Sequence, residues 1–395
     1  MTTNTPAAPS SSPLTRVAPV LRGLLSEATG NEDHPRRPVI LRSLTDREAL
    51  AFAAGGLDRP RSLQDLRRAP LRLDPLAQDL ADDVLRARLA ESLSRYEVEH
   101  QAKPEIVCLP AVAVFHVGNP VPSPGHDPRL ANKVALVTGA AGAIGYGICR
   151  GLLQRGCQVA ITDLAGEKLD RFAAEFDELD AARTMSVPMD VTEAASVARA
   201  FSEIIGNWGG VDIVVINAGI ALAGSLAEIE VDAFRRLERV NVEGTLLTLA
   251  EAGRHFARQN TGGDVVLIST KNVYAPGAGF GAYSATKAAA HQLARIASLE
   301  LAPINVRVNM VAPDAVFSGG EHKSGLWAEV GPGRMKARGL DQKGLEDYYR
   351  NRNLLKIRVT AEHVANAVLF FAARETPTTG ACLPVDGGLP DATPR

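Results

Sequence analysis

The sequence predicts an α/β protein, a doubly wound parallel sheet with helices on both faces, joined to a smaller and mostly helical N-terminal unit. After Leu130, short apolar runs alternate regularly with helical stretches. These runs lack the polar alternation of half-exposed strands, which is typical of parallel strands that are covered on both faces. One run leads into a glycine-rich turn and then a helix, a recurrent feature of such sheets.

The N-terminal part is expected to comprise a tail and an extension. Residues 1–17 begin with a segment rich in Thr, Ala, Pro and Ser, which predicts a disordered tail. Residues 18–129 are predicted to form an α/β extension, whose clearest helix spans Leu76–Tyr96 after a cap at Asp74–Pro75. Within the same extension, Glu105–Val117 is predicted to form two short strands.

A Pro- and Gly-rich stretch, residues 118–128, is predicted to link this extension to a domain that spans residues 130–395. The expected strands of that domain are Lys133–Val137, Gln158–Thr162, Thr184–Pro188, Ile213–Asn217, Asp264–Ser269 and Asn305–Val311. Helices are expected between them, the first ending at Leu153 and the second spanning Glu167–Phe176. This order of strands and helices is that of a Rossmann-type domain.

Composition narrows the class of function. The formal net charge of -2 does not indicate a nucleic-acid or anionic-membrane partner. The 4 cysteines have no paired spacing, which favours free thiols in a reducing compartment, and the 8 histidines are too dispersed to predict a metal site. The start of the chain lacks a secretion signal, and no apolar run reaches the roughly 20 residues that a membrane span needs. We therefore expect a cytoplasmic protein.

The turn after the first strand of the large domain has the sequence TGAAGAIG, residues 138–145. Glycines at this place let the backbone approach a pyrophosphate, which binds at the N-terminus of the following helix. The next strand ends in Asp163, and an acidic residue there accepts hydrogen bonds from a ribose 2′-hydroxyl and repels a 2′-phosphate. A simple turn residue is the alternative for Asp163. Because the loop and the positions after Asp163 lack a basic cluster, NAD is predicted rather than NADP.

Tyr283 and Lys287 lie one turn apart on a predicted helix and therefore on the same face. A phenol ordinarily has a pKa near 10, and an ammonium beside it favours the phenolate and lowers that pKa. Such pairs also arise by chance, so a packed tyrosine with an exposed lysine is the alternative. The position of the pair after a glycine-rich loop and an apolar strand favours general acid–base chemistry.

Taken together, these motifs resemble the short-chain dehydrogenase/reductase family over essentially all of residues 130–395. The matching motifs occur in the family's order and are TGAAGAIG, Asp190–Val191, Asn217–Ala218–Gly219, Asn241, Tyr283-x-x-x-Lys287 and Val385–Asp386–Gly387–Gly388. The resemblance implies that Tyr283 is the general acid–base and that Lys287 lowers its pKa and binds the nicotinamide ribose. It also implies that Asn241 anchors a water in a proton relay to Lys287.

The resemblance further implies the contacts to the cofactor. Asp190 and Val191 would hold the adenine, and residues 217–219 would support the floor of the cofactor cleft. The full set of expected cofactor-binding residues is Gly139, Ala143, Ile144, Gly145, Asp163, Asp190, Val191, Asn217, Ala218, Gly219, Tyr283, Lys287 and Pro313.

Three positions depart from the family pattern. The second loop glycine is Ala143, whose methyl narrows the approach to the phosphates. The family's Pro-Gly after the sixth strand is Pro313–Asp314 here. The substrate-orienting serine is replaced by Thr270, with Ser269 beside it. A threonine hydroxyl can donate to a carbonyl, so we favour Thr270, with Ser269 as the alternative, because neighbouring strand residues point to opposite faces.

A narrower resemblance concerns Thr270–Lys271–Asn272, Pro313–Val316, the segment up to Tyr348–Arg350 and the ending VDGGLPDATPR. They resemble the dehydrogenase half of bifunctional rhamnulose-1-phosphate aldolase/alcohol dehydrogenases, in which that half acts on lactaldehyde. The aldolase half is absent, because residues 1–130 lack the histidine cluster that its metal needs. Residues 317–352 occupy the place of the family's substrate-covering loop.

The sequence thus predicts an NAD-dependent oxidoreductase that interconverts a small hydroxy compound and its carbonyl form. The hydroxy compound would be a hydroxy-aldehyde, a sugar-type alcohol or another secondary alcohol. A catalytically silent NAD-binding sensor or scaffold is the alternative, although the retention of Tyr283 and Lys287 favours the enzyme. The resemblance implies a homodimer or homotetramer. Residues 18–129 could pack on the sheet edge, mediate oligomerisation or bind a partner.

Overall fold

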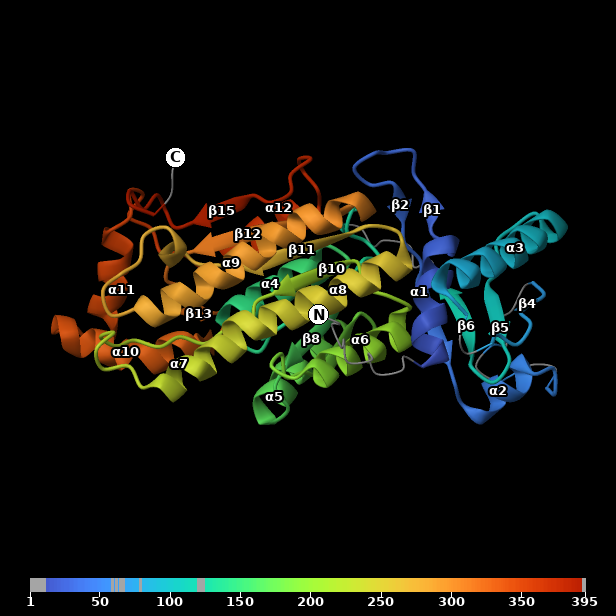
Figure 1. The fold of residues 1–395 in the computed structure, drawn as a ribbon, viewed down its shortest axis with the longest axis horizontal. Coiled ribbons are helices and arrows are strands. Elements are labelled where there is room, and N and C mark those ends of the chain that lie inside the picture. Colours follow the sequence, from blue (N-terminus) through green and yellow to red (C-terminus); the bar gives the residue numbers. More distant parts are fainter. Residues whose placement is uncertain are drawn as a thin grey trace, which may run out of the picture. The chain divides into compact units, whose positions relative to one another are not determined.

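The computed structural model describes residues 12–57, 60, 63, 68–77, 80–118 and 125–392 (Figure 1). The chain divides into two compact units. The smaller unit comprises the described parts of Met1–Val121 together with Phe201–Val211 and Arg254–Thr261. The larger unit comprises the described parts of Pro122–Ala200, Asp212–Gly253 and Gly262–Arg395.

This division differs from the predicted boundary between residues 129 and 130. The residues just before that boundary belong to the larger unit, because the Asp127 carboxylate accepts hydrogen bonds from Arg129 Nε at 2.9 Å and from Arg155 Nη1 at 3.5 Å. Residues 201–211 and 254–261, predicted to lie in the large domain, belong to the smaller unit. Within that unit, Arg22 Nη1 donates to Gln259 Oε1 at 3.2 Å, a contact between residues too far apart in the sequence for a local pattern to predict.

The smaller unit combines helices with a mixed sheet. Its four-stranded sheet has the order β3-β6-β5-β4, in which only β4 and β5 run parallel, and β1 pairs with β2 separately. The elements are α1 (Pro13–Leu25), β1 (Glu27–Ala28), β2 (Arg36–Arg37), β3 (Ile40–Leu44), α2 (Arg47–Ala53), β4 (Leu71–Arg72), α3 (Asp82–His100), β5 (Ile106–Leu109) and β6 (Ala113–Gly118). The two strands predicted within Glu105–Val117 are therefore present as β5 and β6.

Two predictions for this unit are wrong. The disordered tail predicted for residues 1–17 ends before Pro13, because Ser12 Oγ accepts a hydrogen bond from Thr15 N at 3.3 Å and caps α1; residues 1–11 lie outside the described residues. The helix predicted from Leu76 begins only at Asp82. Its first turn carries Asp82 and Asp83, whose charges favour a helix N-terminus, whereas Asp74–Pro75 lies outside the helix.

The larger unit is built on a seven-stranded sheet, and all of its strand pairs are parallel. The strand order is β15-β12-β11-β10-β7-β8-β9. The strands are β7 (Val134–Val137), β8 (Gln158–Asp163), β9 (Thr184–Pro188), β10 (Ile213–Ile216), β11 (Gly263–Ile268), β12 (Val306–Pro313) and β15 (Cys382–Val385). All six predicted strands are present, with small shifts at their ends. The seventh, β15, was not predicted, because it is short and only half-buried.

Helices cover the sheet on both faces, which confirms the doubly wound fold (Figure 1). Helices α4 and α12 pack closely on each other and on the sheet, and a Cβ at Gly147 of α4 would lie 2.7 Å from the Ala361 carbonyl carbon of α12. The helices are α4 (Ala143–Gln154), α5 (Glu167–Asp180), α6 (Ala194–Trp208), α7 (Val231–Glu238), α8 (Gly244–Gln259), α9 (Gly281–Leu301), α10 (Gly325–Arg338), α11 (Gln342–Asn351) and α12 (Ala361–Ala372), of which α6 from Phe201 on and α8 from Arg254 on belong to the smaller unit. Short pieces complete the unit: η2 (Arg239–Glu243), η3 (Lys271–Val273), η4 (Ala302–Ile304), β13 (Ser318–Gly319) and β14 (His322–Lys323).

The strand order reverses between β7 and β10. From β7 the chain proceeds to β8 and β9 on one side, whereas β10, β11, β12 and β15 follow on the other. In such sheets the loops after the two strands at the reversal part from each other, and they leave a crevice at the carboxyl edge where ligands bind. The glycine-rich turn follows β7 and Asn217 follows β10, so both lie at this crevice.

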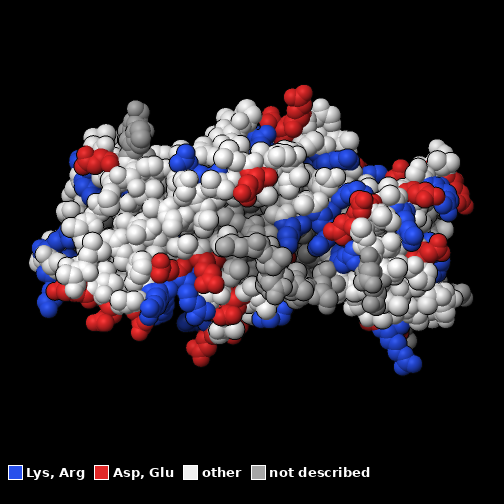
Figure 2. All heavy atoms as spheres, in the orientation of Figure 1, with Lys and Arg blue, Asp and Glu red and all other residues white. Residues whose placement is uncertain are grey.

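On the face seen in Figure 2, basic and acidic residues are interspersed, in keeping with the formal net charge of -2. Among the described residues, none of the helices has the length and apolar character required to cross a membrane. The described residues also contain no group of three or more His, Cys, Asp and Glu side chains placed to hold a metal ion.

Candidate active site

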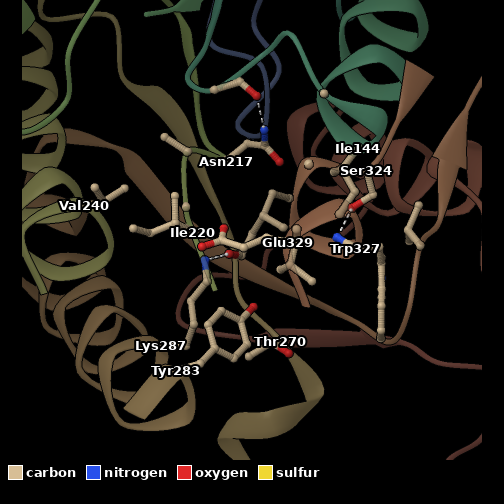
Figure 3. Close-up of a pocket in the computed structure, with 18 of the residues that line it drawn as sticks. Ile144, Asn217, Ile220, Val240, Thr270, Tyr283, Lys287, Ser324, Trp327 and Glu329 are labelled. Atoms are coloured by element: carbon tan, nitrogen blue, oxygen red, sulfur yellow. Dashed lines mark hydrogen bonds between the residues drawn. The ribbon is translucent and has the colours of Figure 1, made fainter. Parts of the chain in front are cut away.

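A pocket of about 980 Å³ opens at the carboxyl edge of the large sheet. Figure 3 shows Tyr283, Lys287 and Thr270 at one end of it and Asn217 at another. Of the residues predicted to act in catalysis or cofactor binding, all but Asn241 line this pocket: Gly139, Ala143, Ile144, Gly145, Asp163, Asp190, Val191, Asn217, Ala218, Gly219, Thr270, Tyr283, Lys287 and Pro313. The fold therefore gathers residues from most of the large unit into one cavity.

The glycine-rich turn is shaped by two close backbone approaches. Gly139 has φ +58°, and a Cβ there would lie 2.6 Å from the Ala218 Cα. A Cβ on Gly145 would lie 2.2 Å from the Ala140 carbonyl oxygen. No side chain caps the first amides of α4, which begins at Ala143 beside the pocket. A glycine cradle with free helix N-terminal amides fits the pyrophosphate of a dinucleotide.

Hydrogen bonds tie the end of β10 to this turn. Asn217 Nδ2 donates to the carbonyl oxygens of Gly139 at 2.8 Å and Thr138 at 3.1 Å (Figure 3). The Thr138 hydroxyl accepts from the backbone amides of Asn217 and Ala218, each at 3.0 Å. Thr138 was not predicted as a site residue, although its place at the start of TGAAGAIG could have indicated it. These bonds fix the two sides of the crevice relative to each other.

Asp163 ends β8 at the rim of the pocket. Its carboxylate accepts hydrogen bonds from Ala141 N at 3.0 Å and from Leu164 N at 2.8 Å. Lys168 Nζ lies 4.0 Å from Asp163 Oδ2, and its side chain is 63% exposed. A mobile cation beside this carboxylate was not anticipated from the sequence, which shows no basic cluster directly after Asp163.

The loop after β9 forms another part of the pocket wall. Asp190 Oδ1 accepts hydrogen bonds from Thr192 N at 2.9 Å and Thr192 Oγ1 at 2.8 Å, so the carboxylate is engaged within its own loop. Val191 is buried against α8, where a Cβ on Gly244 would lie 2.8 Å from Val191 Cγ2. Val191 therefore offers the pocket an apolar surface of the kind that suits an adenine ring.

Tyr283 and Lys287 project from α9 into the pocket, and both are buried (Figure 3). Lys287 Nζ donates to the Ile268 carbonyl oxygen at 2.9 Å, which holds the ammonium beside the end of β11. Burial raises the pKa of Tyr283 to about 12, and a hydrogen bond with Thr270 acts in the opposite direction. Burial lowers the pKa of Lys287 to about 8. In the chain without a cofactor, burial has the largest effect on the Tyr283 pKa, and Lys287 is not among the groups that shift it, so the expected lowering by the lysine stays a prediction.

Ser269 and Thr270 are distinguished by their partners. Ser269 Oγ is hydrogen-bonded to His291 Nδ1 at 3.0 Å, and His291 Nε2 in turn to Tyr274 Oη at 3.2 Å. Thr270 lies beside the Tyr283 ring in Figure 3 and forms the hydrogen bond that acts on the Tyr283 pKa. His291 and Tyr274 were not predicted, because their role depends on the packing of α9 against the segment after β11.

Asn241 lies behind the pocket rather than on its wall. It belongs to η2, a π-helical turn, and is buried. Its Oδ1 accepts from Ile220 N, and its Nδ2 donates to Ile220 O and to Thr286 Oγ1, each at 3.0 Å. At Gly219, a Cβ would lie 3.2 Å from Asn241 Oδ1 and 3.3 Å from Lys287 Nζ. The missing side chain of Gly219 therefore leaves room between the amide and the ammonium.

Helices α10 and α11 cover the side of the pocket where a substrate would enter. Phe317, Trp327 and Tyr349 form an aromatic cluster, with ring centroids 4.6 Å apart for Phe317 and Trp327 and 4.9 Å apart for Trp327 and Tyr349. The Arg352 guanidinium pairs with the Asp314 carboxylate. Within the segment 317–352, the residues Trp327, Arg334, Arg338, Tyr348, Tyr349 and Arg352 line the pocket, whereas Met335 and Arg350 do not.

Comparison with known proteins gives one consistent result. Residues 133–328 match the model of the short chain dehydrogenase family. The chain is 36% identical over 271 residues to the uncharacterized oxidoreductase YuxG of Bacillus subtilis (strain 168), and this match covers 68% of the chain but only 39% of YuxG. It is 34% identical over 266 residues to the mitochondrial (-)-isopiperitenol/(-)-carveol dehydrogenase of Mentha piperita, covering 66% of the chain and 94% of that protein.

Further matches agree with these. The sorbitol dehydrogenase of Cereibacter sphaeroides is 34% identical over 201 residues, covering 51% of this chain and 76% of that protein. The crystal structure of a short-chain type dehydrogenase/reductase from Mycobacterium marinum aligns with a TM-score of 0.57 and 25% identity, covering 66% of this chain and 96% of the other.

Proposed function

This chain belongs to the short-chain dehydrogenase family, and from that membership we propose that it is an NAD-dependent oxidoreductase acting on a small hydroxy compound. The reaction would interconvert a CH–OH group and its carbonyl form. The observation that carries the proposal is the group formed by Tyr283, Lys287 and Thr270 at one end of the pocket whose other walls form a glycine cradle. A sensor or scaffold that only bound the dinucleotide would not require such a group.

Tyr283 and Thr270 would have separate roles in the proposed reaction. A bound NAD would supply the hydride acceptor for oxidation of the carbinol carbon, and NADH the hydride donor for reduction of the carbonyl carbon. Tyr283, as the phenolate, would take the proton of the alcohol during oxidation and, as the phenol, would donate a proton to the carbonyl oxygen during reduction. Thr270 donates a hydrogen bond to the same oxygen and fixes its distance from the phenol. In oxidation, one hydride and one proton thus leave the substrate.

Lys287 would place a positive charge near the Tyr283 phenol. Its ammonium is buried and held by the Ile268 carbonyl oxygen. A positive charge at this place stabilises a developing phenolate, although burial raises the Tyr283 pKa to about 12 in the chain alone. Asn241 would connect Lys287 to water through the gap left by Gly219, where both side chains come near the same backbone position. The role of Asn241 is to position this relay rather than to touch the substrate.

The preference for NAD is part of the proposal and rests on Asp163. Its carboxylate lies at the pocket rim, where it would bind a ribose 2′-hydroxyl and repel a 2′-phosphate. Lys168, 4.0 Å away, acts in the opposite direction. Because Lys168 is largely exposed to solvent and Asp163 is held by two backbone amides, we expect the carboxylate to dominate.

The class of substrate follows from two indications. The motifs around Thr270–Asn272 and the C-terminal sequence resemble the dehydrogenase half of bifunctional rhamnulose-1-phosphate aldolase/alcohol dehydrogenases. Relatives of this chain include a sorbitol dehydrogenase and a meso-2,3-butanediol dehydrogenase. Both indications favour a small polyol, hydroxy-aldehyde or other secondary alcohol. We further propose a homo-oligomer in the cytoplasm, where the free thiols of the 4 cysteines would remain reduced.

The decisive experiment compares the native chain with Tyr283→Phe on a panel of small diols, polyols and hydroxy acids, with NAD and NADP in parallel. We expect turnover with NAD by the native chain and a loss of at least about 10³-fold in Tyr283→Phe, with the dissociation constant for NADH nearly unchanged. Turnover by Tyr283→Phe at the native rate would disprove the mechanism. NADH binding by the native chain without turnover of any member of the panel would favour the sensor.

A further inference from the structure

Four basic side chains line the part of the pocket that η3, α10 and α11 enclose: Lys271, Arg334, Arg338 and Arg352. Two carboxylates also line this part, Asp314 and Glu329. Asp314 forms a salt bridge with Arg352, and Glu329 is exposed to solvent. Among the described residues, none of the other three basic side chains has a carboxylate within ion-pair distance. This region therefore carries uncompensated positive charge.

Arg334 links this charge to the catalytic tyrosine. Its guanidinium carbon lies 4.6 Å from the centroid of the Phe280 ring, and that ring contacts the Tyr283 ring edge-on at 6.1 Å between centroids. Arg334 Nη1 donates to the Ala278 carbonyl oxygen at 3.3 Å, whereas its buried Nε has no hydrogen-bond partner among the described residues. Buried guanidinium donors are normally satisfied, so the unpartnered Nε is unusual; because it is covered in the chain alone, a ligand would reach the guanidinium through its Nη atoms.

Lys271 supports the same interpretation independently. It follows Thr270 directly in the chain, and its ammonium donates one hydrogen bond, to the Ala275 carbonyl oxygen at 3.0 Å. The pKa of Lys271 is lowered first by burial and next by the positive charge of Arg352. The charge of Arg334 lowers it further, whereas the Asp314 carboxylate raises it. The pKa of Tyr348 is lowered by a hydrogen bond with Arg338 and by the charges of Arg338, Arg352 and Arg334. The basic groups are thus close enough to repel one another.

We propose that these residues form an anion-binding subsite, and that the hydroxy substrate carries a carboxylate or a phosphate. Lys271 and Arg334 would bind the anion directly, and Arg338 would contribute through its position beside Tyr348. This inference rests on the proposed function, whose substrate class it narrows. An anion between the cations would offset their mutual repulsion, and planar guanidinium groups bind carboxylate and phosphate oxygens well.

The subsite would also orient the substrate. Because Thr270 and Lys271 are consecutive, one short segment would bind both the reacting oxygen and the anionic end. Arg334 would approach the anion from α10 on the opposite side, over the Phe280 ring. A neutral diol could still place its hydroxyl at Tyr283, but nothing would hold its other end. The subsite should therefore act mainly on KM.

The test uses the full-length chain with NAD and a matched series of secondary alcohols: 1,2-propanediol, lactate, 3-hydroxybutyrate and 1,2-propanediol 1-phosphate. We expect kcat/KM for at least one anionic member to exceed that of the neutral diol by about tenfold or more. Lys271→Gln and Arg334→Gln should each lower this kcat/KM by about tenfold, chiefly through KM, and should lower kcat/KM for the neutral diol much less. A preference for lactate or 3-hydroxybutyrate would identify a carboxylate, and one for the phosphate ester a phosphate.

Two controls separate this subsite from general effects. Lys336→Gln removes an exposed charge from the same helix α10, outside the pocket, and should change nothing. Arg334→Lys keeps the charge and should restore part of the affinity lost in Arg334→Gln. If the neutral diol is turned over as well as every anion, and both glutamine variants behave like the native chain, the subsite is refuted while the oxidoreductase function stands.

A second readout does not depend on turnover. Trp327 lines the pocket, so its fluorescence can report the binding of lactate or of the phosphate ester to the chain loaded with NADH. We expect saturable binding by the native chain and weaker binding by Arg334→Gln. If no alcohol is oxidised but this binding pattern is observed, the proposed reaction fails and the anion subsite remains. If equal quenching occurs in both proteins, the subsite itself is overturned.

Discussion

Ser269 and His291 share a hydrogen bond of 3.0 Å between the serine Oγ and the histidine Nδ1. His291 lies one turn beyond Lys287 on α9 and also contacts Tyr274 Oη at 3.2 Å through its Nε2. The Ser269 hydroxyl is therefore engaged within the packing of α9 against β11. The neighbouring Thr270 hydroxyl is the one that interacts with Tyr283. Both Ser269 and Thr270 line the pocket, and this relationship favours Thr270 as the hydroxyl group that would orient a substrate.

The first prediction concerns these two residues. Thr270→Val should lower kcat by about 10²-fold, because it removes a hydrogen-bond donor to the reacting oxygen while keeping the shape of the side chain. Thr270→Ser should keep most of the activity. Ser269→Ala should keep kcat within a few-fold but lower the melting temperature, since it leaves His291 without its buried partner. Steady-state kinetics and thermal melts of the three variants check this. Inactive Ser269→Ala beside active Thr270→Val would reverse the assignment.

The second prediction is a pH dependence of stability that originates at Lys287. Burial lowers the pKa of Lys287 from 10.5 to about 8 in the folded chain, so the unfolded chain binds more protons between these values. The free energy of unfolding therefore rises with pH across that window. Below pH 8 it is about 3 kcal/mol lower than above pH 10.5. Tyr283, whose pKa is raised to about 12, acts in the opposite direction only above pH 10.

Denaturant unfolding of the native chain and of Lys287→Met, compared between pH 8 and 9.5, measures this effect. The free energy of unfolding of the native chain should gain about 2 kcal/mol relative to the variant over that range. Lys336→Met, at an exposed position of α10, should show no such gain. Parallel curves for the native chain and Lys287→Met would mean that the ammonium is not desolvated.

The third prediction concerns cofactor choice. Asp163→Asn keeps an acceptor for only one of the Ala141 and Leu164 amides, which bond different carboxylate oxygens, and removes the charge that repels a 2′-phosphate. The ratio of kcat/KM for NAD over NADP should fall by at least about tenfold. Lys168→Ala should raise the ratio, because it removes a cation 4.0 Å from the carboxylate. Asp170→Asn on α5, outside the pocket, serves as the control. An unchanged ratio in Asp163→Asn would assign Asp163 to the turn alone.

The fourth prediction concerns the glycine-rich turn. Gly139→Ala places a methyl 2.6 Å from the Ala218 Cα at a φ of +58°, so the turn must shift and the backbone is strained. The dissociation constant for NADH should rise by about tenfold or more, with a loss of stability of about 1–3 kcal/mol. Gly333→Ala adds the same methyl where no atom lies within 4 Å and should be neutral. Fluorescence titration with NADH separates the two; equal affinities would show that the turn does not approach the cofactor.

The local pattern of the sequence was sufficient for much of the fold. The six predicted strands and the helices that begin at Ala143 and Glu167 were found because apolar periodicity and turn glycines act over a few residues. The start of α3 was misplaced, since the Asp-Pro signal at Asp74 competed with the acidic first turn at Asp82 and nothing local distinguished them. The strand β15 was missed because it is short and only half-buried and its apolar run is interrupted by Pro384.

By itself, the sequence determined which functional groups are present and their local spacing: a phenol and an ammonium one helical turn apart, a glycine-rich turn after a buried strand, and an acid at the end of the next strand. Only the tertiary structure decided how these groups are used. It turned Ser269 toward His291, placed Asn241 behind Gly219, raised the pKa of Tyr283 by burial and brought Lys271 near Arg334. The physical reason is that burial, charge repulsion and hydrogen-bond partners depend on contacts between distant segments, which local periodicity does not encode.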